Sequence, residues 1–327
     1  METIDLKSLE AESGFAEAEL FERVDNSAIS SEKITAPRYS YWRSVARVFF
    51  KKKINIIVLV ALAVLMVFSF IYPLFVEFNQ FGNVTETSMQ HLSPAAAIRE
   101  KGFSLKWIFG TGLYSESIFD ETWYSARTSV MLALVCASIN LTVGIVIGAI
   151  WGFSKKVDLF MQEVYNIIQN VPYVLFISVF VFIVGQGFWS FVAALTITGW
   201  LGIAYFIRTQ VIIIRDREYN LASRCLGTPL MRLTMKNILP FLTSVIVTLA
   251  ATEIPSYISY EVFLSYIGIG LSAEDPSLGV MINTAQSMFR TFPWMFWIPV
   301  FVASFIAIVL YVVGQNLGDA SDPRTHM

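Results

Sequence analysis

The sequence predicts an all-α polytopic membrane protein with six transmembrane helices, and its composition and its apolar runs lead to this fold class. Hydrophobic residues make up 55% of the 327 residues, charged residues make up only 15%, and the mean hydropathy is +0.61. These values exclude an ordinary soluble chain of the same length. The apolar residues also gather into six runs, and a run of about 20 residues can cross a bilayer as a helix.

Residues 54–75 form the clearest predicted span because they contain no charged residue. This run follows a basic cluster that ends in Lys51, Lys52 and Lys53, and no small-residue cleavage site comes after it. We therefore interpret it as a permanent anchor and not as a removable signal peptide. The other predicted spans are residues 128–153, 157–184, 188–214, 239–260 and 294–314.

Lys and Arg residues concentrate on one side of these spans. With the N-terminus placed inside, the interior segments hold the larger group: Lys51, Lys52, Lys53, Lys155, Lys156, Arg215, Arg217, Arg224, Arg232 and Lys236. The exterior segments hold the smaller group: Arg99, Lys101, Lys106, Arg127 and Arg290. The positive-inside rule therefore predicts that both the N-terminus and the C-terminus are cytoplasmic.

The spans divide the chain into five parts. Residues 1–53 form a cytoplasmic tail whose first 37 residues are rich in Glu, Ser and Ala, which is typical of disordered or loosely helical segments. Residues 39–53 mix aromatic and basic side chains, which predicts an amphipathic helix on the membrane surface. The remaining parts are the first span at 54–75, an extracytoplasmic loop at 76–126 with a loop at 83–93 and a short helix at 94–101, a five-helix core at 127–316, and a cytoplasmic tail at 317–327.

Candidate catalytic and metal-binding residues are scarce. His91 and His326 are the only histidines, and the predicted topology puts them on opposite sides of the membrane, which excludes a His-based metal site and a Ser/His/Asp triad. Cys136 in a span and Cys225 in an inner loop are not expected to pair. No GxxxxGK(S/T) motif occurs, so this chain does not cradle nucleotide phosphates. We expect no enzyme activity, no cofactor bound by this chain and no nucleic-acid partner.

The inner loop at residues 215–240 has the pattern of a helix, a break and a second helix. Gly227 suits the left-handed residue that ends a helix, Thr228 suits an N-cap, and Pro229 suits the first helical position. Three leucines recur at helical spacing and predict an amphipathic second helix about 14 Å long: Leu226, Leu230 and Leu233. Such a helix can dock into a groove of a partner, and an ordinary interfacial loop helix is the alternative.

This loop resembles the cytoplasmic EAA loop of ATP-binding cassette importer permeases, which contacts the ATPase subunit. The positions that match are Ala222, Gly227, Ile238, Leu239 and Pro240. Glu218 and Tyr219 open the loop as a Glu-Tyr pair typically does in the oligopeptide/dipeptide permease family. Other positions follow the order of that family: Asp158, Met161, Pro172, Gly185, Gln186, Trp200, Ala204, Arg208, Gln210 and the segments 261–270, 293–294 and 314–324.

Some positions depart from the family pattern. Within the loop they are Leu221, Ser223, Asn237 and Phe241. Elsewhere they are Glu163, Asn166, Tyr205, Thr209, Leu278, Gln315 and Gly318. These departures leave the fold assignment intact, but they leave open which peptide class, or which solute, is carried.

The resemblance implies the type I ABC importer permease fold and one half of a heterodimeric pore, of the second or C-type subunit, in a bacterial inner (cytoplasmic) membrane. The implied partners are a second homologous permease subunit, two P-loop ATPase subunits that bind ATP and Mg, an extracytoplasmic peptide-binding protein, and an oligopeptide or dipeptide substrate. The residues implied in coupling to the ATPases are Glu218, Tyr219, Ala222, Gly227, Thr228, Pro229, Leu239 and Pro240.

Ionisable residues inside spans are costly and therefore mark candidate translocation paths. Glu253, Arg208 and Glu163 are the candidates in this chain. Glu253, which Pro255 follows, suits a cavity or a helix break, whereas Arg208 and Glu163 lie close enough to the inner end to reach headgroup water or a partner. Glu261 is expected to hold the outer residues 264–270 by hydrogen bonds and not to contact cargo.

Three alternatives remain at this point. A secondary transporter or channel also has six spans, but it is expected to lack the coupling loop with Gly227. A membrane-embedded enzyme is expected to have clustered His, Asp or Glu near one face, and the sequence shows no such cluster. A permease of the same family for nickel, glutathione or an oligosaccharide has the same motifs, because these motifs indicate ATPase coupling and not the cargo.

Overall fold

The computed structural model describes residues 40–78, 89–272 and 274–322. The predicted tail at 1–37, residues 83–88 of the predicted loop, and residues 323–327 at the C-terminal end lie outside this part. The chain divides into a short N-terminal unit, Met1–Tyr41, and a main unit, Trp42–Met327. The description below concerns the main unit, in which every regular element of the described residues is a helix.

Five helices of the described chain are long and apolar enough to cross a membrane, and a sixth crossing results if the bent pair α8 and α9 counts as one. This agrees with the predicted all-α, polytopic fold. The crossings consist of α4 (Lys53–Met66) with η1 (Val67–Ile71) and α5 (Tyr72–Phe75), α7 (Ile118–Phe153), α8 (Lys155–Gln169) with α9 (Tyr173–Val184), α10 (Phe188–Ile197) with α11 (Trp200–Arg215), η4 (Thr234–Ile238) and η5 (Leu239–Leu242) with α14 (Thr243–Tyr266), and α16 (Pro293–Ser321).

Shorter helices lie between and before these crossings. The helix α3 (Tyr41–Lys51) corresponds to the predicted amphipathic segment, and its residues Val45 and Phe49 are buried. The helix α6 (Pro94–Lys101) has the predicted bounds, and the Ser93 hydroxyl caps it by accepting from the Ala96 N–H at 3.3 Å. The other short elements are η3 (Leu105–Trp107), α12 (Glu218–Cys225), α13 (Leu230–Leu233), α15 (Leu278–Ala285) and η6 (Gln286–Met288).

Three of the long helices extend beyond the apolar runs that predicted them. The helix α7 begins at Ile118, well before residue 128, because Ser117 caps it and accepts from the Asp120 N–H at 3.2 Å. The helix α14 continues to Tyr266 and α16 continues to Ser321. Hydropathy marks only the apolar stretch, whereas helical hydrogen bonding continues into the polar turns on either side.

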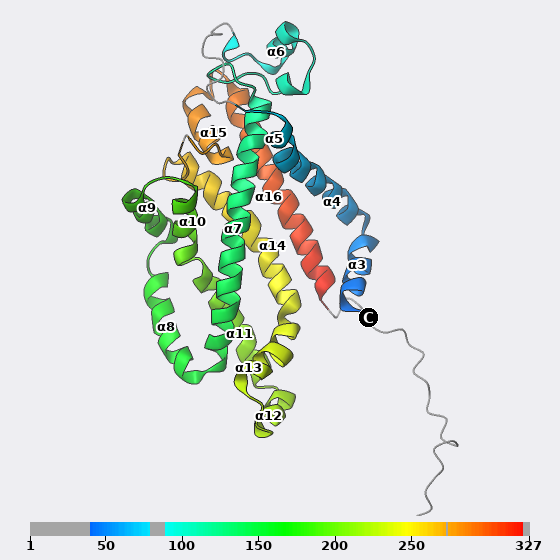
Figure 1. Cartoon of the computed structure of the whole chain (residues 1–327), viewed down its shortest axis with the longest axis vertical. Helices are drawn as coiled ribbons and strands as arrows, with labels where there is room; N and C mark the ends of the chain where they lie inside the picture. The colour runs from blue at the N-terminus through cyan, green and yellow to red at the C-terminus, as the bar shows by residue number, and fades with distance from the viewer. Residues whose placement is uncertain (1–39, 79–88, 273, 323–327) are drawn as a thin grey trace, which may run out of the picture. The chain divides into compact units, whose positions relative to one another are not determined.

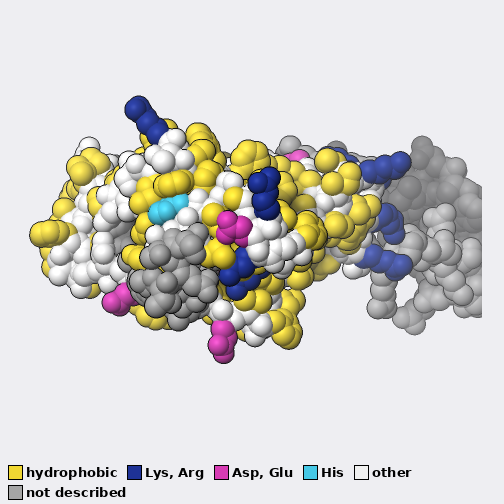
Figure 2. All heavy atoms as spheres, turned by 90° about the horizontal axis from the view of Figure 1, so that it is seen from above, with side chains coloured by type: hydrophobic (Ala, Val, Ile, Leu, Met, Phe, Trp, Pro, Cys, Tyr) yellow, Lys and Arg dark blue, Asp and Glu magenta, His cyan; other side chains and the backbone are white. Residues whose placement is uncertain are grey.

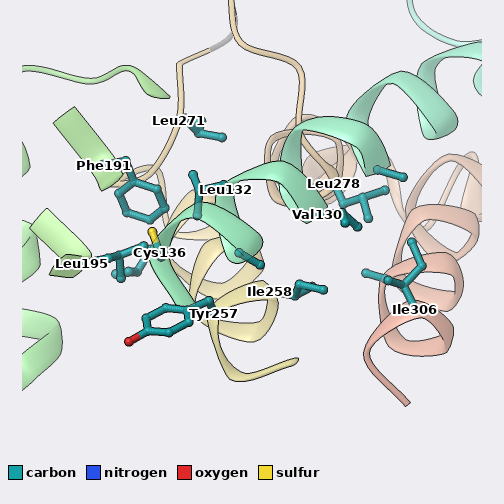
Figure 3. Packing of buried hydrophobic residues seen from close by; sticks show 14 of the residues in the cluster. Val130, Leu132, Cys136, Phe191, Leu195, Tyr257, Ile258, Leu271, Leu278 and Ile306 are labelled. Carbon is teal, nitrogen blue, oxygen red and sulfur yellow. The ribbon is translucent and has the colours of Figure 1, made fainter. Parts of the chain in front are cut away.

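The helix α7 is central to the bundle, where it packs along α11 and α14, while α14 packs along α16 (Figure 1). A continuous apolar core fills these interfaces. Figure 3 shows Cys136 of α7 beside Phe191 and Leu195 of α10, with Tyr257 of α14 close by. All four side chains are at most 3% exposed.

Small residues allow α7 and α11 to approach closely. Gly144, Gly148 and Gly152 recur every four residues on α7 and face α11. A Cβ atom at Gly148 would lie only 2.5 Å from the carbonyl oxygen of Ala204 on α11. Close backbone approach through small residues is a common means of helix association in membranes, where lipid provides no hydrophobic drive between helices.

The α6 end of the bundle is held by polar and aromatic contacts. The Tyr72 hydroxyl donates to Asp120 Oδ1 at 2.6 Å, and Lys106 Nζ lies 3.5 Å from Asp120 Oδ2. The His91 ring stacks on Phe292 with 4.3 Å between ring centroids, and burial lowers the pKa of His91. Seen from this end, isolated charged side chains lie among hydrophobic and other ones (Figure 2).

The close α7–α11 contact predicts opposite effects for the same substitution at two helical glycines. Gly148→Ala is expected to destabilise the purified protein by about 1 to 3 kcal/mol, because the added methyl group overlaps the α11 backbone. Gly202→Ala on α11 adds its methyl group in open space and should be neutral or slightly stabilising. Thermal unfolding in detergent measures both, and equal melting temperatures for the two variants would contradict this packing account.

Candidate functional site

The loop between α11 and α14 contains a sharply defined helix end at Gly227. The Gly227 N–H donates to the carbonyl oxygen of Arg224 at 2.9 Å, and the Thr228 N–H donates to that of Ser223 at 3.1 Å. These two bonds form a Schellman motif, in which the residue after the helix adopts the left-handed conformation. Gly227 has φ +80°, so its predicted positive φ is confirmed. The next helix, α13, begins at Leu230, one residue later than the predicted start at Pro229.

One side of this loop is anchored in the bundle. Asn220 is fully buried, and its Nδ2 donates to the carbonyl oxygen of Ile214 at 2.8 Å. Its Oδ1 accepts from Asn237 Nδ2 at 3.3 Å, which joins the two arms of the loop. Leu233 and Ile238 are buried in an apolar cluster with residues of α7 and α11. The loop is therefore attached to both α11 and the start of α14.

The other side of the loop presents apolar groups to the surroundings. Leu226 is 86% exposed, and the Tyr219 and Phe241 rings lie 6.1 Å apart and are both exposed. Further exposed apolar residues are Leu221 and Met235, and exposed basic residues lie among them: Arg217, Arg224, Arg232 and Lys236. An exposed apolar patch with a charged rim is typical of a protein interface. We call these nine residues the loop patch.

The position of Leu226 differs from the prediction. The spacing predicted that Leu226 shares one helix face with Leu230 and Leu233, but Leu226 caps α12 and lies outside α13. Leu226 is exposed whereas Leu233 is buried. The turn at Gly227 lies between them, so the two leucines belong to different helices. The predicted place of Leu226 on the second helix is therefore wrong, and the exposed apolar surface comes from α12, the turn and the residues before α14.

The charged residues where α11 ends and the loop begins have partners within the chain. Arg215 Nη1 donates to the carbonyl oxygen of Gly152 at 2.8 Å, and Arg215 Nε lies 2.9 Å from Asp216 Oδ1. The hydrogen bond from Arg215 lowers the pKa of the Asp216 carboxyl. The contact with Gly152 connects the end of α11 to the end of α7.

A second site lies where two helices are interrupted. The α8–α9 pair bends by 78° at residues 170–172, and α10 gives way to α11 at Thr198 and Gly199. Residues of both interruptions, together with Glu253 of α14, line one cavity of about 640 Å³. Discontinuous helices at membrane depth commonly form substrate sites in transporters.

Hydrogen bonds satisfy the backbone at this interruption. The carbonyl oxygen of Leu195 accepts from the Tyr173 hydroxyl at 2.8 Å and from Asn140 Nδ2 at 3.2 Å. Asn140 Nδ2 also lies 2.6 Å from the Tyr257 hydroxyl oxygen, to which it donates. Asn140 thus ties α7 to α10 and α14 beside the cavity wall.

Comparison with known families identifies the group to which this arrangement belongs. Residues 144–327, which include the loop and the cavity, match the family described as binding-protein-dependent transport system inner membrane component. The chain belongs to this family. Residues 40–94 match the N-terminal TM domain of oligopeptide transport permease C.

Individual relatives of this permease align with almost its whole length. It is 44% identical over 310 residues to the oligopeptide transport system permease protein AmiD of Streptococcus pneumoniae, with 94% of this chain and 98% of that protein covered. It is 31% identical over 322 residues to the dipeptide transport system permease protein DppC of Lactococcus lactis, covering 90% and 94%. It is 31% identical over 310 residues to the oligopeptide transport system permease protein OppC of Bacillus subtilis, covering 93% and 97%.

The predicted coupling residues of this permease lie together on and beside the loop patch. Tyr219 belongs to the patch itself. Glu218, Ala222, Gly227, Pro229 and Pro240 are exposed, and Thr228 and Leu239 are partly buried. Their placement on one accessible loop is compatible with a shared contact, and their role in coupling stays a proposal.

The three ionisable residues predicted for the path lie in different surroundings. Glu253 lines the cavity, and α14 continues without interruption through Pro255, so the alternative of a helix break there is wrong. Arg208 has a partner within the chain, because its Nε and Nη2 donate to the two carboxylate oxygens of Asp158 at 2.6 and 3.0 Å. Glu163 is exposed on α8, and neither it nor Arg208 lines the cavity.

Sequence reasoning did not single out the polar and aromatic residues around Glu253. They are Asn140, Tyr173, Thr198, Tyr257 and Tyr260. The available signals were the polar Asn140 within a long apolar run and the Pro172 and Gly199 interruptions of two predicted spans.

Glu261 forms the centre of a buried network near the α6 end. It accepts from the Ser129 hydroxyl at 2.6 Å and from the Ser265 hydroxyl at 3.1 Å. Ser129 and Ser265 accept in turn from the backbone N–H groups of Leu278 and Leu271, each at 3.2 Å. The expectation that Glu261 holds the following loop by hydrogen bonds is thereby confirmed.

This network predicts a local loosening when its acceptor is removed. Glu261→Leu leaves the buried Ser129 and Ser265 hydroxyls without their carboxylate acceptor, which should cost on the order of 2 to 4 kcal/mol. Hydrogen–deuterium exchange of the segment 267–278 should therefore become faster. The control is Glu163→Leu, at an exposed carboxylate, which should leave this segment unchanged. Unaltered protection in Glu261→Leu would show that the network does not hold the segment.

Proposed function

We propose that this chain forms one half of the translocation pore of an ATP-binding cassette importer for oligopeptides or dipeptides. The supporting observation is the 44% identity to an oligopeptide permease across 94% of the chain, combined with an exposed apolar loop patch at one end of the bundle. Membership in a binding-protein-dependent family argues against the alternative of a secondary transporter that works alone. The cargo is proposed from the relatives' names, because the shared segments concern the whole bundle and not a cargo site.

The proposed assembly places this chain in a bacterial cytoplasmic membrane with both termini inside. The α12 end, which carries the basic loop patch, is then cytoplasmic, as the positive-inside rule favours. A second permease subunit completes the pore, two P-loop ATPases bind ATP and Mg at the cytoplasmic face, and an extracytoplasmic binding protein delivers the peptide. In this proposal the chain catalyses no reaction and binds no cofactor, and it converts movement of the ATPases into movement of its helices.

The geometry supports a direct mechanical connection from the loop patch to the cavity. Asn220 and Asn237 hold the loop to α11 and to the residues before α14. The helix α11 begins at the Gly199 interruption, and α14 carries Glu253 about 15 Å along its axis from Thr243. A displacement of the loop would therefore move two walls of the same cavity as semi-rigid elements, as alternating access requires.

The turn at Gly227 provides the test of this proposal. A Cβ at Gly227 meets no atom within 4 Å, so a substitution there acts through the backbone, whose φ of +80° is costly for any residue with a side chain. Gly227→Ala should weaken the coupling of ATP hydrolysis to peptide uptake, and Gly227→Val should abolish uptake while the spans stay inserted. Both activities are measured in the complex reconstituted in liposomes.

A matched control exists at the other end of the bundle. Gly102 ends α6 with φ +86°, and a Cβ atom there would also meet no atom within 4 Å, so Gly102→Val imposes positive-φ backbone strain away from the loop. We expect Gly102→Val to keep coupled uptake. The proposal fails if Gly227→Val remains assembled and transports at the parental rate, or if the parental complex takes up no peptide at all.

A further inference from the structure

Glu253 is a carboxylate inside a membrane-spanning helix with no basic residue beside it. Within residues 40–78, 89–272 and 274–322, the ion pairs join Lys106 to Asp120, Arg208 to Asp158 and Arg215 to Asp216, and none includes Glu253. The described lining of the cavity also contains no Lys or Arg. An ionisable group in this position is costly unless a charge of opposite sign offsets it.

Four tyrosines line the same space, Tyr165 among them, and the other three lie close to one another. Tyr173 and Tyr260 are in edge-to-face contact with 5.4 Å between centroids, and Tyr257 lies 6.3 Å from Tyr260. The Tyr173 hydroxyl donates to Leu195, and the Tyr257 hydroxyl oxygen accepts from Asn140, so hydrogen bonds fix both rings. Aromatic faces attract organic cations, most strongly where water is excluded.

The interruption between α10 and α11 contains a buried polar atom without a hydrogen-bond partner in the described part of the chain. Thr198 belongs to the cavity lining, and its buried Oγ1 has no hydrogen-bond partner in the described part of the chain. Buried hydroxyls are nearly always satisfied, so such an atom indicates a missing partner. An ammonium group has three N–H donors and no acceptor, which suits a carboxylate and a hydroxyl oxygen.

Other ligand classes fit the cavity less well. An anion or a peptide carboxylate would face Glu253 with no basic residue to bind it. A metal ion would find Glu253 as the single carboxylate, and the lining contains no His or Cys. An organic cation therefore matches the described lining best.

We propose that this cavity binds a primary ammonium group of the transported peptide, through charge attraction to Glu253 and contact with the Tyr173, Tyr257 and Tyr260 rings. The ammonium group belongs either to the peptide N-terminus or to a lysine side chain. The identity of the cargo rests on the proposed function, whereas the preference of the cavity for cations does not. Glu253 is thus a specificity-determining residue of the path.

Gly202 allows a local test that does not require transport. It lines the cavity, is exposed, and has open space around its Cβ position, so Gly202→Cys places a thiol there without a clash. The assembled complex, with Cys136→Ala and Cys225→Ser in this chain, is treated in detergent with the cationic reagent 2-(trimethylammonium)ethyl methanethiosulfonate and with the anionic 2-sulfonatoethyl reagent. The rate ratio of the two reagents measures the charge preference of the cavity.

The cation-to-anion rate ratio at Gly202→Cys should fall on the order of 10-fold when Glu253→Gln is added, since one unit charge at short range governs it. Glu253→Asp should keep the ratio, and Glu163→Gln, at an exposed carboxylate of α8, should leave it unchanged. Glu253→Gln is nearly isosteric and removes an uncompensated charge, so folding is expected to persist, and thermal unfolding checks this. An unchanged ratio in Glu253→Gln would overturn the proposal.

Peptides then identify the source of the ammonium group. Protection of the Gly202→Cys thiol is measured with Ala-Ala-Ala, with N-acetyl-Ala-Lys-Ala and with N-acetyl-Ala-Ala-Ala. Protection by the first indicates the N-terminus, protection by the second indicates lysine, and protection by the third as strong as by the others would overturn recognition of an ammonium group. If the charge preference holds but the complex neither binds nor takes up any peptide, the proposed function fails while the cation site stands.

Discussion

The structure depends on one constraint: polar groups within a membrane-spanning bundle must find their partners inside the chain. The packing of α7 against α11 and α14 makes this possible at each depth. Near one end, Glu261 accepts hydrogen bonds from two serine hydroxyls. In the middle, Asn140 and Tyr173 donate hydrogen bonds to the Leu195 carbonyl oxygen. Near the other end, Arg208 donates to Asp158. The interruptions and the buried charges of this permease are tolerated because of these contacts.

The same constraint marks the surfaces on which other molecules are expected to act. Glu253 is a carboxyl group that none of the ion pairs in the described chain includes, and it lines a cavity. In the loop patch the apolar side chains of Leu226 and Phe241 are exposed beside basic side chains, although apolar groups are usually buried. The helices α11 and α14 connect these two places, and the proposed coupling would act through them.

Much of this arrangement followed from the sequence because it depends on local chemistry. Long apolar runs predicted the crossings, and Gly227 before Thr228 and Pro229 predicted the left-handed helix end. Glu261 in an apolar run predicted a hydrogen-bonded carboxylate. These features need only the covalent preferences of a few neighbouring residues or the cost of burying a charge.

The remaining features depend on residues far apart in the chain. The pairing of Arg208 with Asp158 joins positions 50 residues apart, and no local pattern indicates it. The 78° bend before α9 and the gathering of Tyr173, Thr198 and Glu253 around one cavity likewise arise from tertiary packing. Leu226 was placed on the wrong helix because leucine spacing alone does not show which side of a turn is anchored.

The central claim is that the exposed turn of the loop patch is the contact through which the ATPase moves this permease. It is tested most directly by replacing Leu226, which is 86% exposed, with the photoreactive residue p-benzoylphenylalanine in the assembled complex. Phe103 in the α6 region, 82% exposed, provides the matched control position. Irradiation should join Leu226 to the ATPase subunit and Phe103 to no ATPase. If the Leu226 position gives no ATPase adduct, or if the Phe103 position gives the same adduct, the claim is contradicted.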